Sequence, residues 1–491
     1  MAAFFHAARC VTFGGEACKS GFMASHSSPR TVALLLAAGQ GTRMKSSLPK
    51  VLHPLAGLPM VHHGVAAALD AGCSQVIVVV GHGRELVEAY LTKAFGERVS
   101  FALQPQQLGT GDAVRCGVAA LPAGTERVLV FYGDAPLIEG TDLRALLGAE
   151  GALVLATCCL AAPFGYGRIL RDEAGRVVAI REEKDCATAA ERAITEINPG
   201  VYVFALEFLE NSLAKLEPKN AQGELYLTDL VAIAAASGLD ATPIAARAEV
   251  LVGCNDRAQL FEAELTLRER IHGRLRKSGV TVSAGALVDA GVVVEPDVAI
   301  GPNVVLRGNT LVKSGARLDV GCVLDNVTVE RDAYLKPYTV AQDSVIGARA
   351  QVGPFAHLRP KSDLGADVHI GNFVETKNTK LAQGAKANHL AYLGDGVVGE
   401  RVNIGAGTIF CNYDGFQKHL TIIEDDAFIG SDSQIVAPVT IGRGAYVGTG
   451  TTVTMSVPAD GLALSRVKQE NKEGYAVRLR ARFKAAKEGK K

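Results

Sequence analysis

The sequence lacks three features that would each point to a particular class of protein. Lys and Arg together number 51 and so do Asp and Glu, so the net charge is zero and no overall field attracts nucleic acid. None of the ten cysteines forms the C-x-x-C pair of a zinc site or a redox dithiol, which indicates free thiols in a reducing compartment. No run approaches the ~18 apolar residues of a membrane span. We therefore expect a cytoplasmic protein without nucleic-acid or membrane partners.

The length of the chain favours two domains. With 491 residues, 48% of them hydrophobic, the chain exceeds the size at which one core stops growing. Residues 1–30 match neither half, because they are basic, poor in acidic residues and carry only short apolar patches. We predict a disordered leader, with the true start at Met23 or nearby, and an organellar transit peptide is the alternative.

Apolar runs of strand length recur through the first half of the chain. They begin at Thr31 with TVALLLAAG and return at residues 75–80, 127–131 and 152–156, with helix-compatible stretches between them. This alternation predicts a Rossmann-like three-layer α/β sandwich with a mostly parallel sheet over residues 31–258. Ligands of such sheets bind at the carboxyl ends of the strands, so we expect the site residues directly after the strands.

Glycine-rich and charged loops follow these strands. The first strand runs into LAAGQGTRM and LPK, where glycines let the backbone approach a phosphate and Arg43 and Lys50 can neutralise it. The spacing is not that of a Walker ATPase. Asp134 ends the third strand, where a carboxylate can bind Mg²⁺, and the amide-rich loop 104–112 suits a nucleobase. For these segments a plain turn, a helix cap or a surface loop is the alternative.

A period of six residues replaces the helical pattern in the second half. Residues 259–279 carry an amphipathic linker helix. Beyond it, aliphatic residues recur without slippage at Ile423, Ile429, Ile435, Ile441, Val447 and Val453. This hexapeptide pattern predicts a left-handed parallel β-helix over residues 280–491, which ends in a basic tail. We expect the last eight positions of that tail to be solvated and partly disordered.

Two segments, around His389 and Tyr413, interrupt the six-residue repeat with polar and aromatic residues that a coil core does not need. A histidine suits the deprotonation of a substrate ammonium, which must become a free amine before it attacks a thioester. A structural histidine on a scaffold is the alternative. The polar and aromatic residues that accompany His389 favour the catalytic interpretation.

Several motifs together resemble one family. In order, LAAGQGTRM, LPK, QLGTG, YGDAPL and GYGRI are similar to motifs of sugar-nucleotide pyrophosphorylases, and specifically of the bacterial bifunctional N-acetylglucosamine-1-phosphate uridylyltransferases and glucosamine-1-phosphate N-acetyltransferases. The resemblance runs from about Val32 to the C-terminus. It implies acetylation of glucosamine-1-phosphate by acetyl-CoA, then transfer of UMP from UTP to the product with release of pyrophosphate. It also implies Mg²⁺ as cofactor and, by analogy, a homotrimer.

The same resemblance implies the roles of individual residues. Those for UTP and UDP-N-acetylglucosamine are Leu36, Ala37, Ala38, Gly39, Arg43, Lys50, Gln104, Gly109, Thr110, Tyr132, Gly133, Asp134, Gly167, Glu182, Asn198 and Asn255. Asp134 and Asn255 would bind the metal. His389 would be the catalytic base of acetyl transfer, and the residues for glucosamine-1-phosphate are Arg359, Lys377, Tyr392 and Asn403. Those for acetyl-CoA are Ala406, Asn412, Tyr413, Ser431, Thr449 and Arg466.

Two other functions are compatible with this pattern. The first is a pyrophosphorylase with one activity on another sugar-1-phosphate, whose β-helix serves only for assembly. The second is a regulatory subunit without turnover. Loss of Lys50, Asp134 or the loop glycines would mark such a subunit, and all of them are present.

Overall fold

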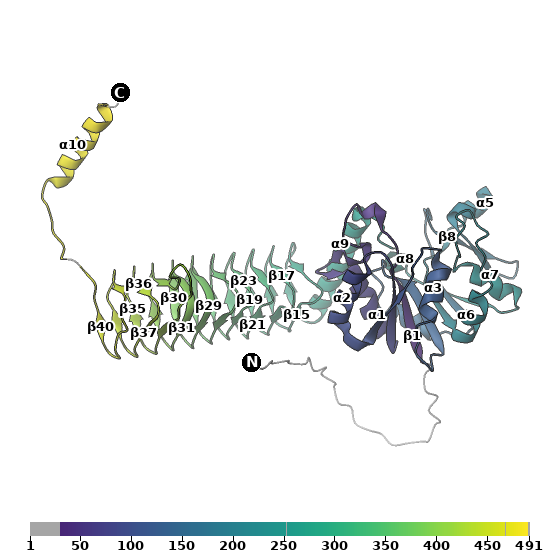
Figure 1. The fold of residues 1–491 in the computed structure, drawn as a ribbon, viewed down its shortest axis with the longest axis horizontal. Coiled ribbons are helices and arrows are strands. Elements are labelled where there is room, and N and C mark those ends of the chain that lie inside the picture. Colours follow the sequence, from purple (N-terminus) through teal and green to yellow (C-terminus); the bar gives the residue numbers. More distant parts are fainter. Residues whose placement is uncertain (1–29, 252, 467, 490–491) are drawn as a thin grey trace, which may run out of the picture.

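The computed structural model describes residues 30–251, 253–466 and 468–489. It has an α/β part and a long parallel β-helix, connected by helix α9 (Arg257–Lys277) (Figure 1). This agrees with the predicted fold class. The predicted leader lies outside the described residues, apart from Arg30. None of the described helices combines the length and apolarity that crossing a lipid bilayer requires. The cysteines among the described residues are free, as predicted.

A ten-stranded sheet forms the centre of the α/β part, in the order β10-β8-β9-β12-β7-β11-β6-β1-β4-β5. Strand β1 pairs in parallel with β6 and β4, and β4 with β5, whereas β11 inserts antiparallel between β6 and β7. The strands are β1 (Thr31–Leu36), β4 (Gln75–Val80), β5 (Val99–Leu103), β6 (Arg127–Tyr132), β7 (Leu153–Cys159), β8 (Gly167–Arg171), β9 (Val177–Arg181), β10 (Glu196–Asn198), β11 (Tyr202–Ala205) and β12 (Ala241–Ala245).

Helices cover both faces of this sheet. Every residue of β1 is buried, and because side chains alternate along a strand, Ala33 and Leu35 join one core while Val32 and Leu34 join the other. Helix α1 packs on the first face and α3 on the second. The helices of this part are α1 (Met60–Asp70), α2 (Arg84–Phe95), α3 (Thr110–Val118), α4 (Gly140–Leu147), α5 (Ala189–Ala193), α6 (Leu206–Leu213), α7 (Asp229–Ala236) and α8 (Ala248–Leu251).

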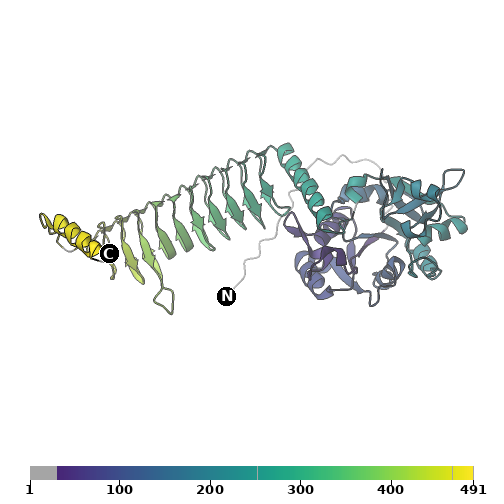
Figure 2. The same cartoon turned by 90° about the horizontal axis from the view of Figure 1, so that it is seen from above.

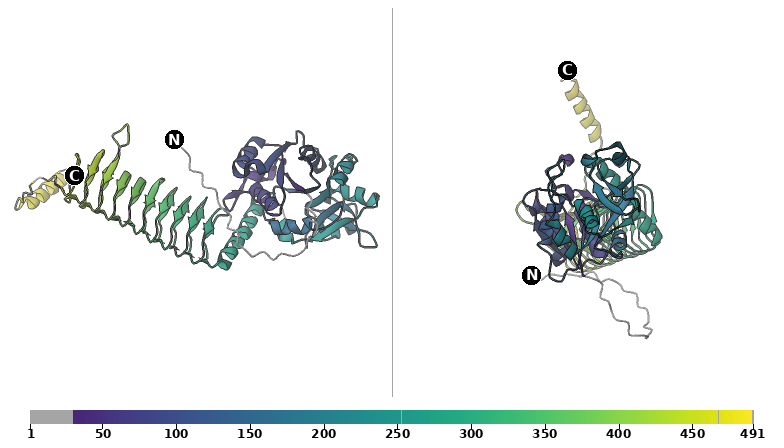
Figure 3. Two further views of the ribbon diagram at one scale, coloured as in Figure 1. Left: turned by 90° about the horizontal axis from the view of Figure 1, so that it is seen from below. Right: turned by 90° about the vertical axis from the view of Figure 1, so that its right-hand side faces the viewer.

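The β-helix runs from β13 (Thr281–Val282) to β40 (Leu462–Ala463), and its coils stack along one axis that leads away from α9 (Figures 2 and 3). Each strand pairs in parallel with the equivalent strand of the next coil, 17 or 18 residues on in most coils, as Val305 pairs with Val323 and Val323 with Val340. The six predicted aliphatic residues, from Ile423 to Val453, are all buried in the coil core. The prediction of a β-helix from the six-residue period is therefore confirmed.

One coil is longer than its neighbours. Strand β31 (Tyr392–Val398) pairs with β34 (Thr421–Ile423) through Gly396 and Thr421, so the chain between them contains an insertion. This insertion, residues 412–420, projects from the side of the β-helix as a loop (Figure 2). It contains Tyr413, where the hexapeptide pattern was interrupted.

Helix α9 contacts both parts of the protein. Asp256 caps its first turn by accepting hydrogen bonds from the amides of Ala258 and Gln259. Further along, Arg270 donates a 2.6 Å bond to the carbonyl of Leu137, and Arg268 donates a 3.1 Å bond to Asp289 at the start of the β-helix. The helix is therefore held on the α/β part and on the first coils at the same time.

The basic tail forms helix α10 (Tyr475–Glu488), none of whose side chains is buried. Our expectation of a solvated tail agrees with this exposure. Residues 484–488 belong to this helix, in line with the high helix propensity of Ala, Arg and Lys, and partial disorder of the last eight positions stays a prediction. Residues 490 and 491 lie outside the described residues.

Candidate nucleotide and acyl-transfer sites

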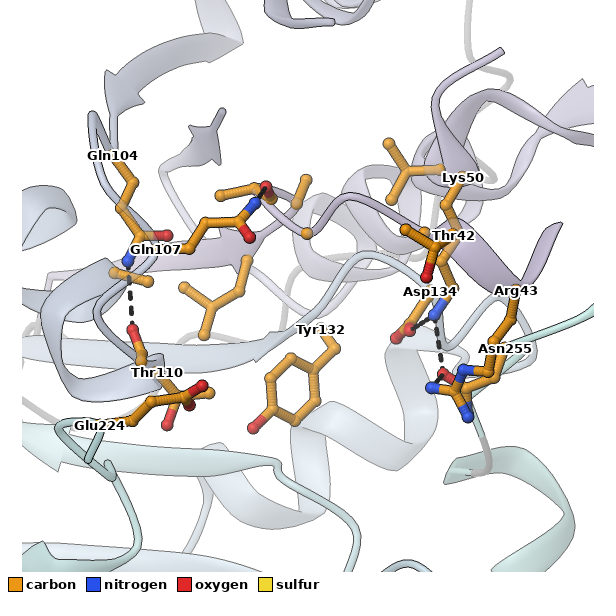
Figure 4. A pocket seen from close by; sticks show the side chains of 18 residues that line it. Thr42, Arg43, Lys50, Gln104, Gln107, Thr110, Tyr132, Asp134, Glu224 and Asn255 are labelled. Atoms are coloured by element: carbon orange, nitrogen blue, oxygen red, sulfur yellow. Dashed lines mark hydrogen bonds and ion pairs between the residues drawn. The ribbon is translucent and has the colours of Figure 1, made fainter. Parts of the chain in front are cut away.

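A cavity of about 360 Å³ opens at the carboxyl ends of β1 and β6 (Figure 4). The predicted nucleotide residues on its wall are Leu36, Ala37, Ala38, Gly39, Arg43, Lys50, Gln104, Gly109, Thr110, Tyr132, Asp134 and Asn255. Gly133 lies between two of them but is not part of the wall. Residues from four separate loops thus meet at one sheet edge, as expected for a parallel α/β sheet.

Cationic side chains lie at one end of this cavity. The chain turns sharply after β1 because Gly41 adopts a left-handed conformation with φ of 62°, which directs Arg43 and Lys50 toward the carboxyl end of β6. Lys50 forms an ion pair with Asp134 and donates a 2.9 Å hydrogen bond to Oδ1 of Asn255. Arg43 donates a 2.8 Å bond to the same Asn255 oxygen. The four side chains form one connected cluster.

Amide groups lie at the opposite end, with Tyr132 between the two ends (Figure 4). Gln104 is buried, and its Nε2 donates to the Gly109 carbonyl at 3.1 Å and to Asp112 at 3.0 Å. Gln107, which lies in the predicted base-binding loop but was not among the predicted contact residues, donates a 2.7 Å bond to the Ala38 carbonyl. These bonds hold the loop against the end of β1, on the wall of the cavity.

A second cavity of about 210 Å³ adjoins the first and shares Tyr132, Asp134 and Asn255 with it. Its wall contains Gly167, Glu182 and Asn198, which are the three residues predicted to bind the amino sugar. Burial is the main cause that raises the pKa of Glu182, followed by the approach of Asp185 and Asp229, whereas Thr228 and Arg168 work against the increase. Burial, followed by the nearby Glu182 and Asp134, also raises the pKa of Tyr132.

Four hydrogen bonds lie in or directly behind the wall of the second cavity. Asn198 donates a 2.6 Å bond to the Tyr202 hydroxyl and accepts one from the amide of Gly200. Arg168 lies just behind the wall, donates to the carbonyl of Tyr166, and binds Glu183 at 2.5 Å. Sequence reasoning missed Arg168 and Tyr166, although both belong to the GYGRI motif that signalled the family.

The residues predicted for glucosamine-1-phosphate lie on neighbouring coils of the β-helix. Arg359 follows β26 (His357–Leu358), Lys377 lies in β29 (Glu375–Leu381), and Tyr392 begins β31. Strand register brings them together, since Lys377 pairs with Gly394, two residues after Tyr392. Arg359 also forms a 2.7 Å ion pair with Glu375, which raises the pKa of the guanidinium.

Lys418 is a further cation at this place. It lies in the inserted loop, beside Lys377. Lys418 is the main cause of the lowered pKa of that lysine. It also lies 3.7 Å from Asp395. Burial acts to raise the pKa of Asp395, but hydrogen bonds from Asn378 and Asn412 and the charges of Lys418 and Lys377 together lower it. No sequence signal singled out Lys418, because it lies 41 residues along the chain from Lys377. Only the fold of the inserted loop places it beside that lysine. Two adjacent ammonium groups form a ready site for a phosphate.

His389 ends strand β30 (Lys386–His389) and is exposed. Its register partner on β28 (His369–Asn372) is Asn372, whose Oδ1 lies 3.3 Å from Nδ1 of His389. A hydrogen bond at Nδ1 leaves Nε2 available as a base. The asparagine was not among the predicted residues, although a partner that orients the ring is a general need of a histidine base.

The residues predicted for acetyl-CoA lie toward the end of the β-helix. Ala406, Ser431 and Thr449 each follow by two positions the paired residues Ile404, Ile429 and Val447, so they form a row over three coils. The remaining contacts are a 3.1 Å bond from Arg466 to the Thr449 carbonyl, a 2.6 Å bond from the Tyr413 hydroxyl to Gly415, and a 2.5 Å bond from Asn412 to Asp395. Asn403 lies one coil before Phe428. The structure thus connects Thr449 with Arg466, whereas the Tyr413 hydroxyl bonds within its own loop.

Metal ligands are sparse. Among the described residues no group of three His, Cys, Asp or Glu side chains converges on a point that could hold a metal ion. Asp134 and Asn255, however, direct one oxygen each to a single cation, the ammonium of Lys50. A carboxylate and an amide oxygen are ligands that Mg²⁺ accepts, and it takes the rest from phosphates and water. The two predicted ligands therefore fit a metal held jointly with a nucleotide.

The fold and these sites define a nucleotidyltransferase joined to a hexapeptide-repeat transferase. Residues 33–195 match the MobA-like NTP transferase domain, residues 282–353 the GMPPB C-terminal domain, and residues 420–454 the bacterial transferase hexapeptide (six repeats). A solved UDP-glucose pyrophosphorylase complexed with UDP-glucose aligns over 49% of this chain and 99% of its own, with 21% identity and a TM-score of 0.41.

Relatives over nearly the full length identify the family. The bifunctional protein GlmU of Sorangium cellulosum is 61% identical, covering 94% of this chain and 99% of that protein, and that of Geobacter metallireducens is 46% identical, covering 91% and 98%. The chain therefore belongs to the GlmU family. The prediction of a bifunctional uridylyltransferase and acetyltransferase of UDP-N-acetylglucosamine synthesis is confirmed. The family does not support the alternatives of a pyrophosphorylase with one activity or of a regulatory subunit without turnover.

Proposed function

We propose that residues 31–258 transfer UMP from UTP to N-acetylglucosamine-1-phosphate, and that residues 280–491 acetylate glucosamine-1-phosphate, with residues 259–279 as the linker. One observation carries the first assignment. We call the first cavity the nucleotide cavity and the second the sugar cavity. The cluster of Arg43, Lys50, Asp134 and Asn255 lies where these two cavities share a wall. Phosphate groups of two substrates would meet there.

In uridylyl transfer, an oxygen of the sugar phosphate attacks the α-phosphorus of UTP and pyrophosphate leaves on the opposite side. The reaction needs no covalent nucleophile, because positioning and neutralisation of negative charge supply the catalysis. Lys50 and Arg43 would bind phosphate oxygens. Gln104, Gly109 and Thr110 would bind the base and ribose, and Glu182, Asn198 and Gly167 would bind the sugar.

Asp134 and Asn255 would hold Mg²⁺ together with the phosphates of the nucleotide. When bound, it would reduce the negative charge of the triphosphate and help to align it for attack. The two oxygens that meet at Lys50 support this proposal.

In acetyl transfer, His389 would take a proton from the ammonium of glucosamine-1-phosphate. The free amine then attacks the thioester carbon of acetyl-CoA, and the C–S bond breaks with release of the CoA thiol. Arg359, Lys377 and Lys418 would bind the phosphate, while Tyr392 and Asn403 contact the sugar. The row of Ala406, Ser431 and Thr449, together with Arg466, Asn412 and Tyr413, would hold acetyl-CoA.

A homotrimer is the assembly that we propose. Tyr338, Phe355, Phe373 and Leu390 occupy equivalent corners of successive coils, and each is about half exposed, at 50%, 49%, 56% and 60%. The three rings stack at centroid distances of 5.3 and 5.7 Å. Leu390 follows His389 directly, so a partner that covers this apolar ladder would also enclose the acyl-transfer site.

The experiment that tests both assignments compares His389→Ala with Asp134→Asn in the full chain. CoA thiol release is followed with glucosamine-1-phosphate and acetyl-CoA, and pyrophosphate release with N-acetylglucosamine-1-phosphate and UTP. We expect His389→Ala to lose thiol release by a factor of at least ~10² while keeping pyrophosphate release, and Asp134→Asn to show the reverse. If one substitution abolishes both activities, the assignment of separate sites is wrong.

A further inference from the structure

We propose that Lys50 is a surrogate cation that occupies the metal position until a nucleotide arrives, so that the divalent metal binds only together with UTP. This inference rests on the proposed uridylyl-transfer function and adds to it a second role for Lys50. The contacts within the cluster of Arg43, Lys50, Asp134 and Asn255 support this role.

Both oxygens that would bind the metal are already engaged. The Lys50 ammonium contacts the Asp134 carboxylate and lies 2.9 Å from Oδ1 of Asn255. Arg43 shares that amide oxygen at 2.8 Å. A divalent ion at this point must therefore displace the ammonium, because two cations within one hydrogen-bond length repel each other strongly.

Burial makes this competition effective. The side chains of Lys50 and Asp134 are only 12% and 23% exposed, so water screens the pair weakly. Residues 253–255 are in turn tied to Asp134, since the Cys254 amide donates a 2.8 Å bond to the Asp134 carbonyl. The pair of ligands is thus preformed, and the ammonium is the group that has to move.

A nucleotide supplies what displacement of Lys50 requires. Its phosphates offer the ammonium a new anionic partner on the same wall, and they add oxygen ligands to a metal that otherwise has two from the protein. Among the described residues no group of three His, Cys, Asp or Glu side chains could hold a metal ion. Metal and UTP should therefore bind cooperatively, with Lys50 passing from Asp134 to a phosphate as they enter.

The test uses Mn²⁺ alone as the probe. Binding of Mn²⁺ to the full chain without nucleotide is followed by the loss of the free-ion signal in electron paramagnetic resonance. We expect Lys50→Met to bind Mn²⁺ at least about tenfold more tightly than the parent protein, and Lys50→Arg, which keeps the charge, to bind as weakly as the parent. The double variant Lys50→Met/Asp134→Asn should lose the gain. Thermal unfolding midpoints check that each variant folds.

Equal Mn²⁺ affinity of the parent protein and a folded Lys50→Met variant overturns the inference. A second titration, with UTP present, separates this failure from failure of the metal site itself. If Asp134→Asn weakens Mn²⁺ binding only with UTP present, and Lys50→Met leaves binding without UTP unchanged, the metal site stands and the surrogate role of Lys50 is wrong. If Asp134→Asn has no effect in either titration, the metal site is wrong as well.

Discussion

The guanidinium of Arg168 and the carboxylate of Glu183 form a 2.5 Å ion pair in which the arginine side chain is only 2% exposed. Arg168 also donates to the Tyr166 carbonyl, so one buried side chain connects two segments that wall the sugar cavity. Its Nε has no partner among the described residues. A buried charge lowers the stability of the fold unless its partners stay in place.

Substitution of Arg168 should therefore loosen the sugar cavity. We expect Arg168→Met to raise the KM for N-acetylglucosamine-1-phosphate about tenfold and to leave the KM for UTP within about twofold, because the nucleotide cavity does not contact Arg168. Arg168→Lys should recover part of the loss. Steady-state kinetics with each substrate varied in turn measures the difference.

A matched control for this prediction is Arg171→Met. Arg171 lies on the same strand β8 and binds Glu196 at 2.7 Å, but unlike Arg168 it donates to no residue on the wall of the sugar cavity. Its KM values should stay close to those of the parent protein. Equal increases of both KM values in Arg168→Met would argue for a general loss of folding instead of a role at the sugar cavity.

Lys418 should affect the KM for glucosamine-1-phosphate, the acyl acceptor, and not the KM for UTP. In Lys418→Met we expect the KM for glucosamine-1-phosphate to rise about tenfold, because one of the three cations that we propose to bind its phosphate is lost. Since Lys418 lowers the pKa of Lys377, that pKa should rise toward its usual value in the variant. Initial rates of thiol release measure the first effect. Lys380→Met, which removes a lysine 3.8 Å from Asp363 on a neighbouring coil, should leave this KM unchanged.

His62 should make the α/β part sensitive to acid. Burial, and secondarily His63, lowers the pKa of His62 from 6.5 to about 4. The folded state thus binds the proton less readily than the unfolded state. The stability of the fold with a neutral, buried His62 is therefore fully present above pH 6.5 and is lost progressively as the pH falls toward 4. The loss amounts to at most about 3 kcal/mol.

Urea unfolding at pH 7 and at pH 4.5 tests this effect. We expect His62→Phe to lose less stability than the parent protein over that interval, although it loses the 2.9 Å bond between Tyr90 and His62 at both pH values. His82→Phe, at an exposed position, serves as control and should follow the parent curve. Identical acid sensitivity of His62→Phe and the parent would remove His62 as the cause.

The apolar ladder of the β-helix should govern assembly. We expect Phe373→Glu to sediment as a monomer and to lose acetyl transfer while it retains uridylyl transfer, because a charge in the middle of the ladder opposes burial. Sedimentation velocity and the two activity assays check this. Phe164→Glu changes an 85% exposed ring on the α/β part and should assemble as the parent does. A monomeric parent protein would contradict the proposed trimer itself.

Local patterns in the sequence were enough for most of the architecture. The run TVALLL is apolar on both faces, and such a strand is stable only inside a sheet covered on both sides. The six-residue spacing of aliphatic residues is equally local, since each coil repeats the same turn and buries the same side chain. The motifs after the strands indicated the nucleotide cavity because parallel strands bring their carboxyl ends to one edge.

The contacts that set the chemistry depend on residues far apart in the chain. Asn255 lies 205 residues from Lys50, and nothing in either local segment states that they share a hydrogen bond. Likewise, Lys418 meets Lys377 only because the inserted loop folds back over the coil. Arg168 was overlooked because an arginine on a strand usually faces water, whereas here strand pairing and Glu183 hold it inside.

The sequence by itself determined the two kinds of fold, their order and the loops that carry the predicted residues, because periodicity and glycine-rich turns act over a few neighbouring positions. Only the tertiary structure decided that Lys50 binds both candidate metal ligands, that Arg168 lies behind the sugar cavity and that Lys418 lies beside Lys377. Those relationships depend on distance in space, which packing and strand register set and which no local pattern encodes.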